Sequence, residues 1–258
     1  MTPRLIVLVP PSETKSRGGT NRRRVGAFDA SLGELRSSVV ESLHDVVKIG
    51  ATAELERVLR ARGALLARAL EATRSLSEGT PSTLPAWRRY CGVVWTHLDA
   101  SSLSAGQRDR IIVPSGLYGL SAGNDLVADY RLRMDVNVPP LGNVAAFWRP
   151  HLARALADHV GSATVVNLLP AQHQSAVDLD QVRSRTRVID VAFVQGNGSG
   201  AAGHDAKAVK GVVARRLLQQ GVSSMGSFEW EGWSTRCTGD HVTVTAPGVR
   251  PRDRRRRS

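Results

Sequence analysis

The sequence predicts an α/β (α+β) fold, in which a mixed β-sheet is flanked by helices. Short runs of β-branched and leucine residues alternate with longer stretches whose apolar residues recur every three or four positions. The chain has 258 residues, of which 41% are hydrophobic, so it is long enough to bury a substantial core. We expect one domain over residues 1–249 and a disordered, Arg-rich tail over 250–258.

Six segments are expected to be strands. Residues 4–9 are nearly all β-branched or leucine, which is typical of a buried strand, and Pro10-Pro11 ends it. The other candidates are short apolar runs that lie between turn residues. These candidates span residues 91–96, 110–114, 163–169, 187–194 and 241–246.

Four segments are expected to be helices. From Leu55 to Leu70, apolar residues at spacings of three and four form one stripe, as in an amphipathic helix. Pro150 is expected in the first turn of a later helix, where its missing N–H breaks no intrahelical hydrogen bond. The expected helices span residues 31–47, 52–76, 150–160 and 205–219.

A short turn separates the first two expected helices. It reads Lys48-Ile49-Gly50-Ala51, and Thr52 is expected to cap the second helix. The segment near residues 31–76 is therefore helix-hairpin-helix-like, a type of element whose backbone N–H groups bind a DNA phosphate. Lys48 and Gly50 are candidate DNA-binding residues. The alternative is an ordinary helical hairpin with a glycine in its turn.

Polar residues follow three of the expected strands, at the point where each strand ends. They are Ser12, Glu13, Lys15, Ser115, Tyr118 and Asn167. If these strands are parallel, their carboxyl ends share one edge of the sheet, where α/β proteins build their sites. The alternative is that Pro, Gly and Ser only form turns there.

Three of these residues are candidate catalytic groups. Glu13 is a general acid or base candidate, and Lys15 can neutralise an anion. Tyr118 can orient a substrate or donate a proton. Ser12, Ser115 and Asn167 are candidates for binding the ligand itself.

Two further segments supply cations and hydrogen-bond donors. Tyr130 and Arg131 lie in a charged stretch where a guanidinium can clamp a phosphate or carboxylate, although a solvated face is the alternative. His204, Lys207 and Lys210 recur at a spacing of three near a helix start. The chain has only four lysines against 31 arginines, and two of the four are in this group. Because lysines at a helix N-terminus oppose the macrodipole, a role in anion binding is favoured over a purely stabilising one.

The formal net charge of +12 and the isoelectric point of about 11.0 indicate an anionic partner, either DNA or a small nucleotide-like molecule. The last nine residues carry a net charge of +5, which leaves +7 on the rest. No apolar run reaches the roughly 18 residues of a membrane span. Cys91 and Cys237 form no CxxC, which fits a reducing cytoplasm. No spacing predicts a metal or cofactor, and no obligate protein partner is evident.

The chain resembles the YaaA family of bacterial peroxide-stress-resistance proteins, in its actinobacterial-type branch. The matching pieces are Leu8-Val-Pro-Pro-Ser-Glu-Thr-Lys15, Ser115-Gly-Leu-Tyr-Gly119, Asp129-Tyr-Arg-Leu-Arg-Met134, Phe147-Trp148, Val166-Asn-Leu168 and Ala206-Lys207 through Lys210-Gly211. The resemblance implies a cytoplasmic α/β protein with a basic cleft and a helix-hairpin-helix-like element. It also implies DNA binding and protection against peroxide by limiting free iron, and it brings no established reaction.

By match, the resemblance points to eight positions, namely Lys15, Ser115, Tyr118, Tyr130, Arg131, Asn167, Lys207 and Lys210. The chain departs from the family pattern after Asn167, where an acidic residue and a tyrosine are frequent. Here the segment carries Gln172 and His173. This departure suggests an alternative role, that of an enzyme acting on a phosphate-bearing small molecule in specialised metabolism.

Overall fold

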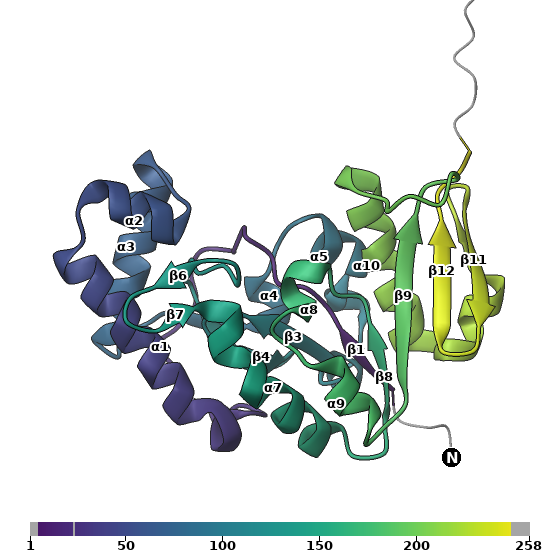
Figure 1. The fold of residues 1–258 in the computed structure, drawn as a ribbon, viewed down its shortest axis with the longest axis horizontal. Helices are drawn as coiled ribbons and strands as arrows, with labels where there is room; N and C mark the ends of the chain where they lie inside the picture. Colours follow the sequence, from purple (N-terminus) through teal and green to yellow (C-terminus); the bar gives the residue numbers. More distant parts are fainter. Residues whose placement is uncertain (1–4, 23, 249–258) are drawn as a thin grey trace, which may run out of the picture.

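The structure, a computed structural model, describes residues 5–22 and 24–248 (Figure 1). Its centre is an eight-stranded mixed sheet with the strand order β10-β11-β12-β9-β8-β1-β3-β4. The predicted α/β class is confirmed. The predicted tail, residues 250–258, lies outside the described residues. The strands of the large sheet are β1 (Leu5–Leu8), β3 (Ile111–Ser115), β4 (Gly119–Ala122), β8 (Thr164–Asn167), β9 (Val188–Val194), β10 (Glu229–Trp230), β11 (Trp233–Thr238) and β12 (His241–Thr245).

The winding of the sheet reverses at β1. This strand pairs in parallel with β3 on one side and with β8 on the other, and β9 and β12 continue the parallel arrangement. All four residues of β1 are buried, as expected for a strand covered on both faces. In open α/β sheets, ligands bind outside the carboxyl ends of the strands where the winding reverses. The loop that leaves β1 is therefore the place to look for a site.

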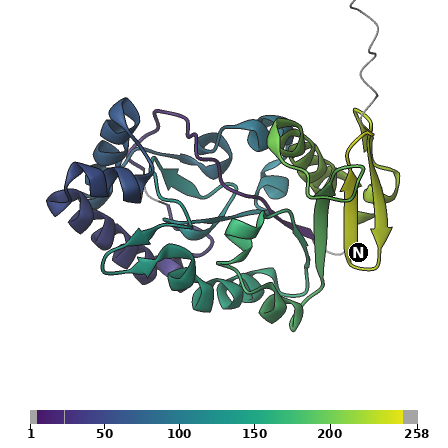
Figure 2. The same ribbon diagram turned by 45° about the horizontal axis from the view of Figure 1, so that its top comes forward.

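Helices cover both faces of the sheet (Figure 2). The first group of covering helices is α10 and α5, and α10 also packs against β1. The second group is α7 and α9, and α7 also packs against β4. The first three helices form a helical lobe, in which α1 packs against α3 and α3 contacts α2 (Figure 1). The helices are α1 (Asp29–Ile49), α2 (Thr52–Leu59), α3 (Gly63–Ser77), α4 (Ala86–Arg89), α5 (Val93–Leu98), α6 (Ala105–Arg108), α7 (Val144–Val160), α8 (Ala171–Gln174), α9 (Leu179–Arg183) and α10 (Gly203–Gln220).

Two two-stranded sheets complete the fold. One pairs β2 (Thr83–Pro85) with β5 (Leu126–Ala128), and the other pairs β6 (Asn137–Val138) with β7 (Gly142–Asn143). Both pairs are antiparallel. Short 3-10 helices span Ala100–Ser102 and Val222–Ser227. Among the residues that the structure describes, no helix is both long and apolar enough to cross a membrane.

The expected strand over residues 91–96 is wrong, because this segment forms helix α5. Its β-branched residues favour a strand locally, but packing against α10 decides the conformation. A Cβ placed on Gly211 of α10 would lie 2.3 Å from the carbonyl oxygen of Val94, so only a glycine allows this close approach. Trp95 is buried and its indole N–H donates to the carbonyl of Pro10 at 3.1 Å, which anchors the helix below the β1 loop.

The helix expected over residues 52–76 is divided into α2 and α3. The break lies at Arg60, whose φ of 46° places it in the left-handed region. Arg131, about 70 residues later in the sequence, stabilises this break directly. Its guanidinium donates to the carbonyls of Leu59 at 2.8 Å and Arg60 at 2.8 Å. The tertiary contact therefore overrides a continuous apolar stripe. The expected cap is also wrong, since the N-cap residue of α2 is Ala51 and Thr52 is already helical.

The expected helix over residues 150–160 begins earlier, at Val144. Pro150 lies inside α7 rather than in its first turn. The start is set by Asn143, whose side-chain oxygen accepts from the backbone N–H of Ala146 at 3.0 Å. Strands β4, β10 and β11 were not among the expected elements, whereas β1, β3, β8, β9 and β12 lie within or beside the expected ranges.

Candidate functional site

The loop after β1 brings Lys15 into the interior. Only 6% of this residue is exposed. Its ammonium group lies 4.0 Å from the ring centroid of Tyr130 and 5.7 Å from that of Tyr90, and it donates to the carbonyl of Ser12 at 3.1 Å. Burial lowers the pKa of Lys15 to about 7; the carboxylate of Asp129 opposes this shift and the cation of Arg131 adds to it.

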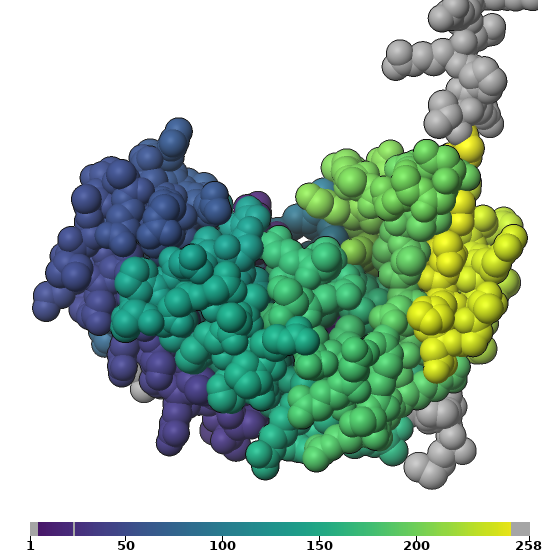
Figure 3. Space-filling view, in the orientation of Figure 1, coloured from purple at the N-terminus to yellow at the C-terminus, as the bar shows by residue number. Residues whose placement is uncertain are grey.

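A pocket opens over Lys15 at the carboxyl ends of β1, β3 and β8, and we call it the Lys15 pocket. Ser12 and Glu13 come from the loop after β1, Gly116 from the loop after β3, and His173 from helix α8 after β8. Its remaining lining residues are Pro11, Lys15, Tyr130, Arg131, Leu132, Arg133, Met134 and Gln172. Figure 3 shows the surface hollowed between the helical lobe and the part of the chain that carries α10.

Three hydroxyl-bearing side chains form a buried network beneath the amine. The hydroxyls of Tyr90 and Tyr130 lie 2.9 Å apart. Ser115, which is fully buried, lies beside them and accepts from the backbone N–H of Tyr118 at 3.3 Å. Burial raises the pKa of Tyr90 to about 12 and that of Tyr130 well above its usual value. These tyrosines therefore stay protonated at neutral pH and present neutral rings to the Lys15 ammonium.

Two arginines face the mouth of the Lys15 pocket. The guanidinium of Arg133 lies 2.9 Å from one carboxylate oxygen of Glu13, and that of Arg131 lies 3.5 Å from the other. Arg133 also makes a two-pronged pair with Asp135, with distances of 2.9 and 3.0 Å. The Glu13 side chain is 58% exposed, so it lies at the surface and can move away. Its carboxylate occupies the place that an anionic ligand would take between the arginines.

His173 and Lys210 extend the charged surface on the α10 side. Burial, together with the nearby positive charges of Lys210 and Arg133, lowers the pKa of His173 to about 4. Burial also lowers the pKa of Lys210 to about 8, and its ammonium lies 5.0 Å from the ring centroid of Phe193. The Nδ1 atom of His173 is buried and has no hydrogen-bond partner within the described part of the chain. His173 therefore lines the Lys15 pocket as a neutral imidazole.

A second cavity adjoins Lys15 along helix α3. Lys15, Tyr130 and Arg131 line both cavities, and Leu65, Ala69 and Ala72 supply the apolar wall of the second. It encloses about 240 Å³. Its polar end is formed by Arg68, whose guanidinium lies 2.7 Å from the Asp129 carboxylate and also donates to the carbonyl of Lys15 at 2.8 Å.

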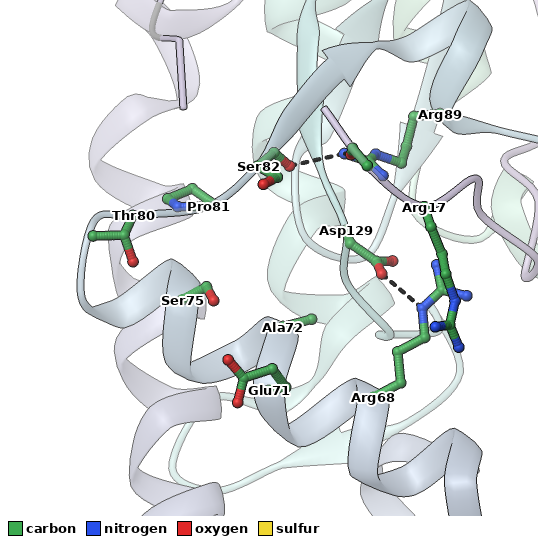
Figure 4. A pocket seen from close by; sticks show the side chains of 11 residues that line it. Arg17, Arg68, Glu71, Ala72, Ser75, Thr80, Pro81, Ser82, Arg89 and Asp129 are labelled. Carbon is green, nitrogen blue, oxygen red and sulfur yellow. Dashed lines mark hydrogen bonds and ion pairs between the residues drawn. The ribbon is translucent and has the colours of Figure 1, made fainter. Parts of the chain in front are cut away.

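The groove continues past Arg68 and Asp129 to Arg17, as Figure 4 shows. Serine and threonine side chains from the end of α3 and the following loop line its far side. Arg89 closes its floor and is fully buried. Its guanidinium donates to four carbonyls, those of Ser16, Gly18, Ser82 and Val127. Arg89 therefore holds the segment after Lys15 against β2 and β5.

Several predicted site residues meet in the Lys15 pocket. Ser12, Glu13, Lys15, Tyr130 and Arg131 all line it, and Lys210 lies close enough for its charge to shift the pKa of His173. Two others lie beneath it as support. Ser115 accepts from the backbone N–H of Tyr118 at 3.3 Å, and the hydroxyl of Tyr118 accepts from the backbone N–H of Ala128 at 2.8 Å.

The other predicted residues lie elsewhere. Asn167 ends β8 as expected, but its amide donates to Asp190 at 2.9 Å and its oxygen accepts from the N–H of Leu169 at 3.0 Å. His204 and Lys207 are exposed on α10, and the ring of His204 lies 6.4 Å from that of His97. Lys48 is exposed at the end of α1 in the helical lobe, and Gly50 follows it.

Four site residues were not expected from the sequence as functional groups, namely Arg68, Arg89, Asp129 and Arg133. Arg133 stands two positions after Arg131 in a matched piece, so a two-residue alternation with the buried Leu132 could have indicated it. Arg68 lies within the apolar stripe of α3, and no local signal marks Arg89. Within residues 5–22 and 24–248, no three or more His, Cys, Asp or Glu side chains are grouped to hold a metal ion.

The fold and this site define an α/β protein whose parallel strands end at a pocket around the buried Lys15. Sequence comparison identifies the family of this protein. The chain belongs to the YaaA family, since residues 5–237 match the family described as peroxide stress protein YaaA.

Relatives described as UPF0246 proteins occur in several bacteria. One from Streptomyces coelicolor is 30% identical over 257 residues and covers 96% of both chains. One from Bacteroides thetaiotaomicron is 30% identical over 193 residues, covering 70% of this chain and 75% of its own. One from Corynebacterium glutamicum is 26% identical over 217 residues, covering 83% of this chain and 84% of its own. The expected family, with actinobacterial members among the relatives, is confirmed.

Proposed function

We propose that the protein binds a small anionic molecule, phosphate-bearing or carboxylate-bearing, in the Lys15 pocket and acts on it as an enzyme in the cytoplasm. One observation carries this proposal: Lys15, Arg131 and Arg133 converge on a pocket at the reversal point of a parallel sheet. Arginine forks match the two oxygens of a phosphate or carboxylate, and a pocket that restricts water strengthens their attraction.

The position of Glu13 supports this proposal. A carboxylate of the protein already bridges Arg131 and Arg133 at 3.5 and 2.9 Å, so an anion of similar size fits between them. Glu13 then acts as an exchangeable counter-ion that leaves when the ligand enters. Lys15, whose pKa burial lowers to about 7, can accept or donate a proton at neutral pH.

Binding of inorganic phosphate, AMP and ATP by the full chain tests this function. We expect Arg133→Gln to weaken binding by tenfold or more, because a two-pronged charge-assisted hydrogen bond to the anion is lost. Glu13→Gln is expected to strengthen binding a few-fold, since it removes the competing carboxylate. Isothermal titration calorimetry measures both. Lys207→Gln is the matched control, because Lys207 is an exposed cation outside the pocket. Equal affinities for wild type and Arg133→Gln would contradict the proposal.

A second candidate function is DNA binding in the peroxide stress response. It is favoured by the turn between α1 and α2, where Lys48 and Ile49 are exposed, Ile49 to 82%. A Cβ on Gly50 would lie 2.5 Å from the carbonyl oxygen of Val46, so this tight turn requires a glycine. The net charge of +7 on the chain without its last nine residues also favours DNA binding, and the family description favours a role in peroxide stress. Such a turn can present backbone N–H groups to a phosphate.

We expect duplex DNA to bind the full chain with an affinity that falls steeply between 50 and 200 mM salt. Lys48→Gln is expected to weaken binding several-fold and to lower the salt dependence by about one phosphate contact. Fluorescence anisotropy measures this, with Lys207→Gln as control. A chain ending at residue 248 separates the turn from the Arg-rich tail. If that chain no longer binds, the turn carries no DNA site. Survival in hydrogen peroxide of the host lacking the gene, complemented with wild type or Lys48→Gln, tests the stress role.

A further inference from the structure

We propose that Lys15 is a nucleophile that forms an imine with the aldehyde or ketone group of a small anionic molecule. This inference rests on the proposed anion-binding function and adds a covalent step and a substrate class to it. It follows from the partners of the Lys15 amine, from the rings and charges around it, and from the two cavities that meet there.

The Lys15 amine has no ionic partner. Among the described residues, no carboxylate lies within salt-bridge distance of it, and its one hydrogen bond is to the Ser12 carbonyl at 3.1 Å. The acid that acts on it most strongly, Asp129, is instead paired with Arg68 at 2.7 Å. A lysine that served only as a structural cation would be paired with an acid. The Ser12 carbonyl therefore holds the amine in place, but no carboxylate balances its charge.

Burial and two neighbouring cations favour the neutral form of the amine. The cations are those of Arg131 and Arg68, and both lower the pKa of Lys15. Burial lowers the pKa of Lys15 to about 7, so about half of the amine is unprotonated at neutral pH. Desolvation and a neighbouring cation are the two means by which proteins activate lysine as a nucleophile.

The two cavities indicate what the amine meets. On one side lies the Lys15 pocket, where Arg131 and Arg133 can hold an anionic group. On the other lies the cavity of about 240 Å³ along α3, with Leu65 and Ala69 on its wall. A molecule with a carboxylate or phosphate at one end and a short carbon body fills both. Its carbonyl carbon then lies between them, beside the amine.

The covalent step balances without an external oxidant or reductant. The unprotonated amine of Lys15 adds its electron pair to the carbonyl carbon, and the carbonyl oxygen takes up the proton that the nitrogen loses. The resulting carbinolamine expels its oxygen as water, leaving a carbon–nitrogen double bond. Protonation of the imine by solvent makes it an electron sink for the adjacent carbon. Arg131 and Arg133 keep the anion in place throughout.

Reductive trapping with glyoxylate and sodium borohydride tests the imine. Glyoxylate joins an aldehyde to a carboxylate, and hydride addition to the imine carbon leaves a carboxymethyl group on the lysine. We expect peptide mass spectrometry of the full chain at pH 7 to find at least tenfold more adduct on Lys15 than on Lys48 or Lys207. The chain has only four lysines, so the amount of adduct on each lysine can be measured separately.

Variants separate the imine from anion binding. Arg131→Gln is expected to lower trapping at Lys15, whereas Lys207→Arg leaves it unchanged; both retain the Lys15 amine. An equal distribution of adduct over the four lysines would overturn the imine. If the same protein still binds phosphate in calorimetry, the proposed function stands without the covalent step. If it binds neither phosphate nor glyoxylate, both fail.

Discussion

Replacing Lys15 with methionine is expected to make the folded protein more stable at pH 6.5, by about 3–5 kcal/mol. The reason is that burial lowers the pKa of Lys15 from 10.5 to about 7. Below pH 7 both the folded and the unfolded chain carry the proton, and the folded chain carries a desolvated charge. Methionine has a similar length and removes that cost. The pocket therefore retains Lys15 at the expense of stability, which is typical of a functional group.

The pH dependence of this effect has a definite sign. Between pH 7 and 10.5 the unfolded chain still binds the proton and the folded chain has released it. The unfolded state then binds more protons, so the stability of the wild type rises with pH. We expect the advantage of Lys15→Met to shrink over this window and to be nearly lost at pH 10.

Urea-induced unfolding at several pH values between 6 and 10 measures this difference. Lys210 also has a pKa lowered by burial, to about 8, but its titration is common to both proteins and cancels in the comparison. Lys207→Met is the matched control, because Lys207 is exposed, and its effect is expected within 0.5 kcal/mol or so at every pH. A stability difference for Lys15→Met that stays constant with pH would show that the amine is not desolvated.

Replacing Arg89 with methionine is expected to destabilise the protein by about 3–5 kcal/mol. Arg89 is surrounded by protein atoms on every side, with 0% of its surface accessible to solvent. Its donors reach Gly18 at 3.0 Å, Ser82 at 2.8 Å and Val127 at 3.1 Å, besides the carbonyl of Ser16. Methionine fills similar space but donates nothing, so four carbonyls, among them that of buried Val127, lose this partner.

The neighbouring arginine provides the control for this prediction. Arg88 lies on the same short helix, α4, and is exposed, so Arg88→Met is expected to cost less than about 1 kcal/mol. Denaturant unfolding compares the two. Because Arg89 holds the segment that follows Lys15, Arg89→Met is also expected to weaken phosphate binding. Identical urea midpoints for the two variants would contradict a bracing role for Arg89.

The strands that carry the site could largely be predicted from the local sequence. Residues 4–9 and 110–114 are short β-branched runs ended by proline or a turn, and such runs have few alternatives to a buried strand. Parallel pairing then brings the loops after β1, β3 and β8 to one edge. Ser12, Glu13 and Lys15 could therefore be predicted to lie at this edge, and the structure places them in one pocket. Tyr130 and Arg131 were predicted to bind an anion from a separate charged stretch, and they line the same pocket.

Residues that act through long-range contacts could not be assigned in this way. The segment over 91–96 has strand propensity, yet the close approach allowed by Gly211 makes it a helix. The break in the helix over 52–76 depends on Arg131, about 70 residues away in sequence, which bonds the carbonyls of Leu59 and Arg60. Local propensities are worth about 1 kcal/mol or less per residue, so a few tertiary contacts outweigh them.

The sequence by itself determined the fold class, the family and the edge of the sheet where the site lies. Only the tertiary structure decided which polar residues line the Lys15 pocket. Asn167 stands at a strand end like Ser115, but its amide is used by Asp190 and Leu169 in a separate groove. Arg133 and His173, by contrast, turn toward Lys15. The physical reason is that strand spacing places a backbone, whereas the direction and charge of a side chain depend on neighbours distant in the sequence.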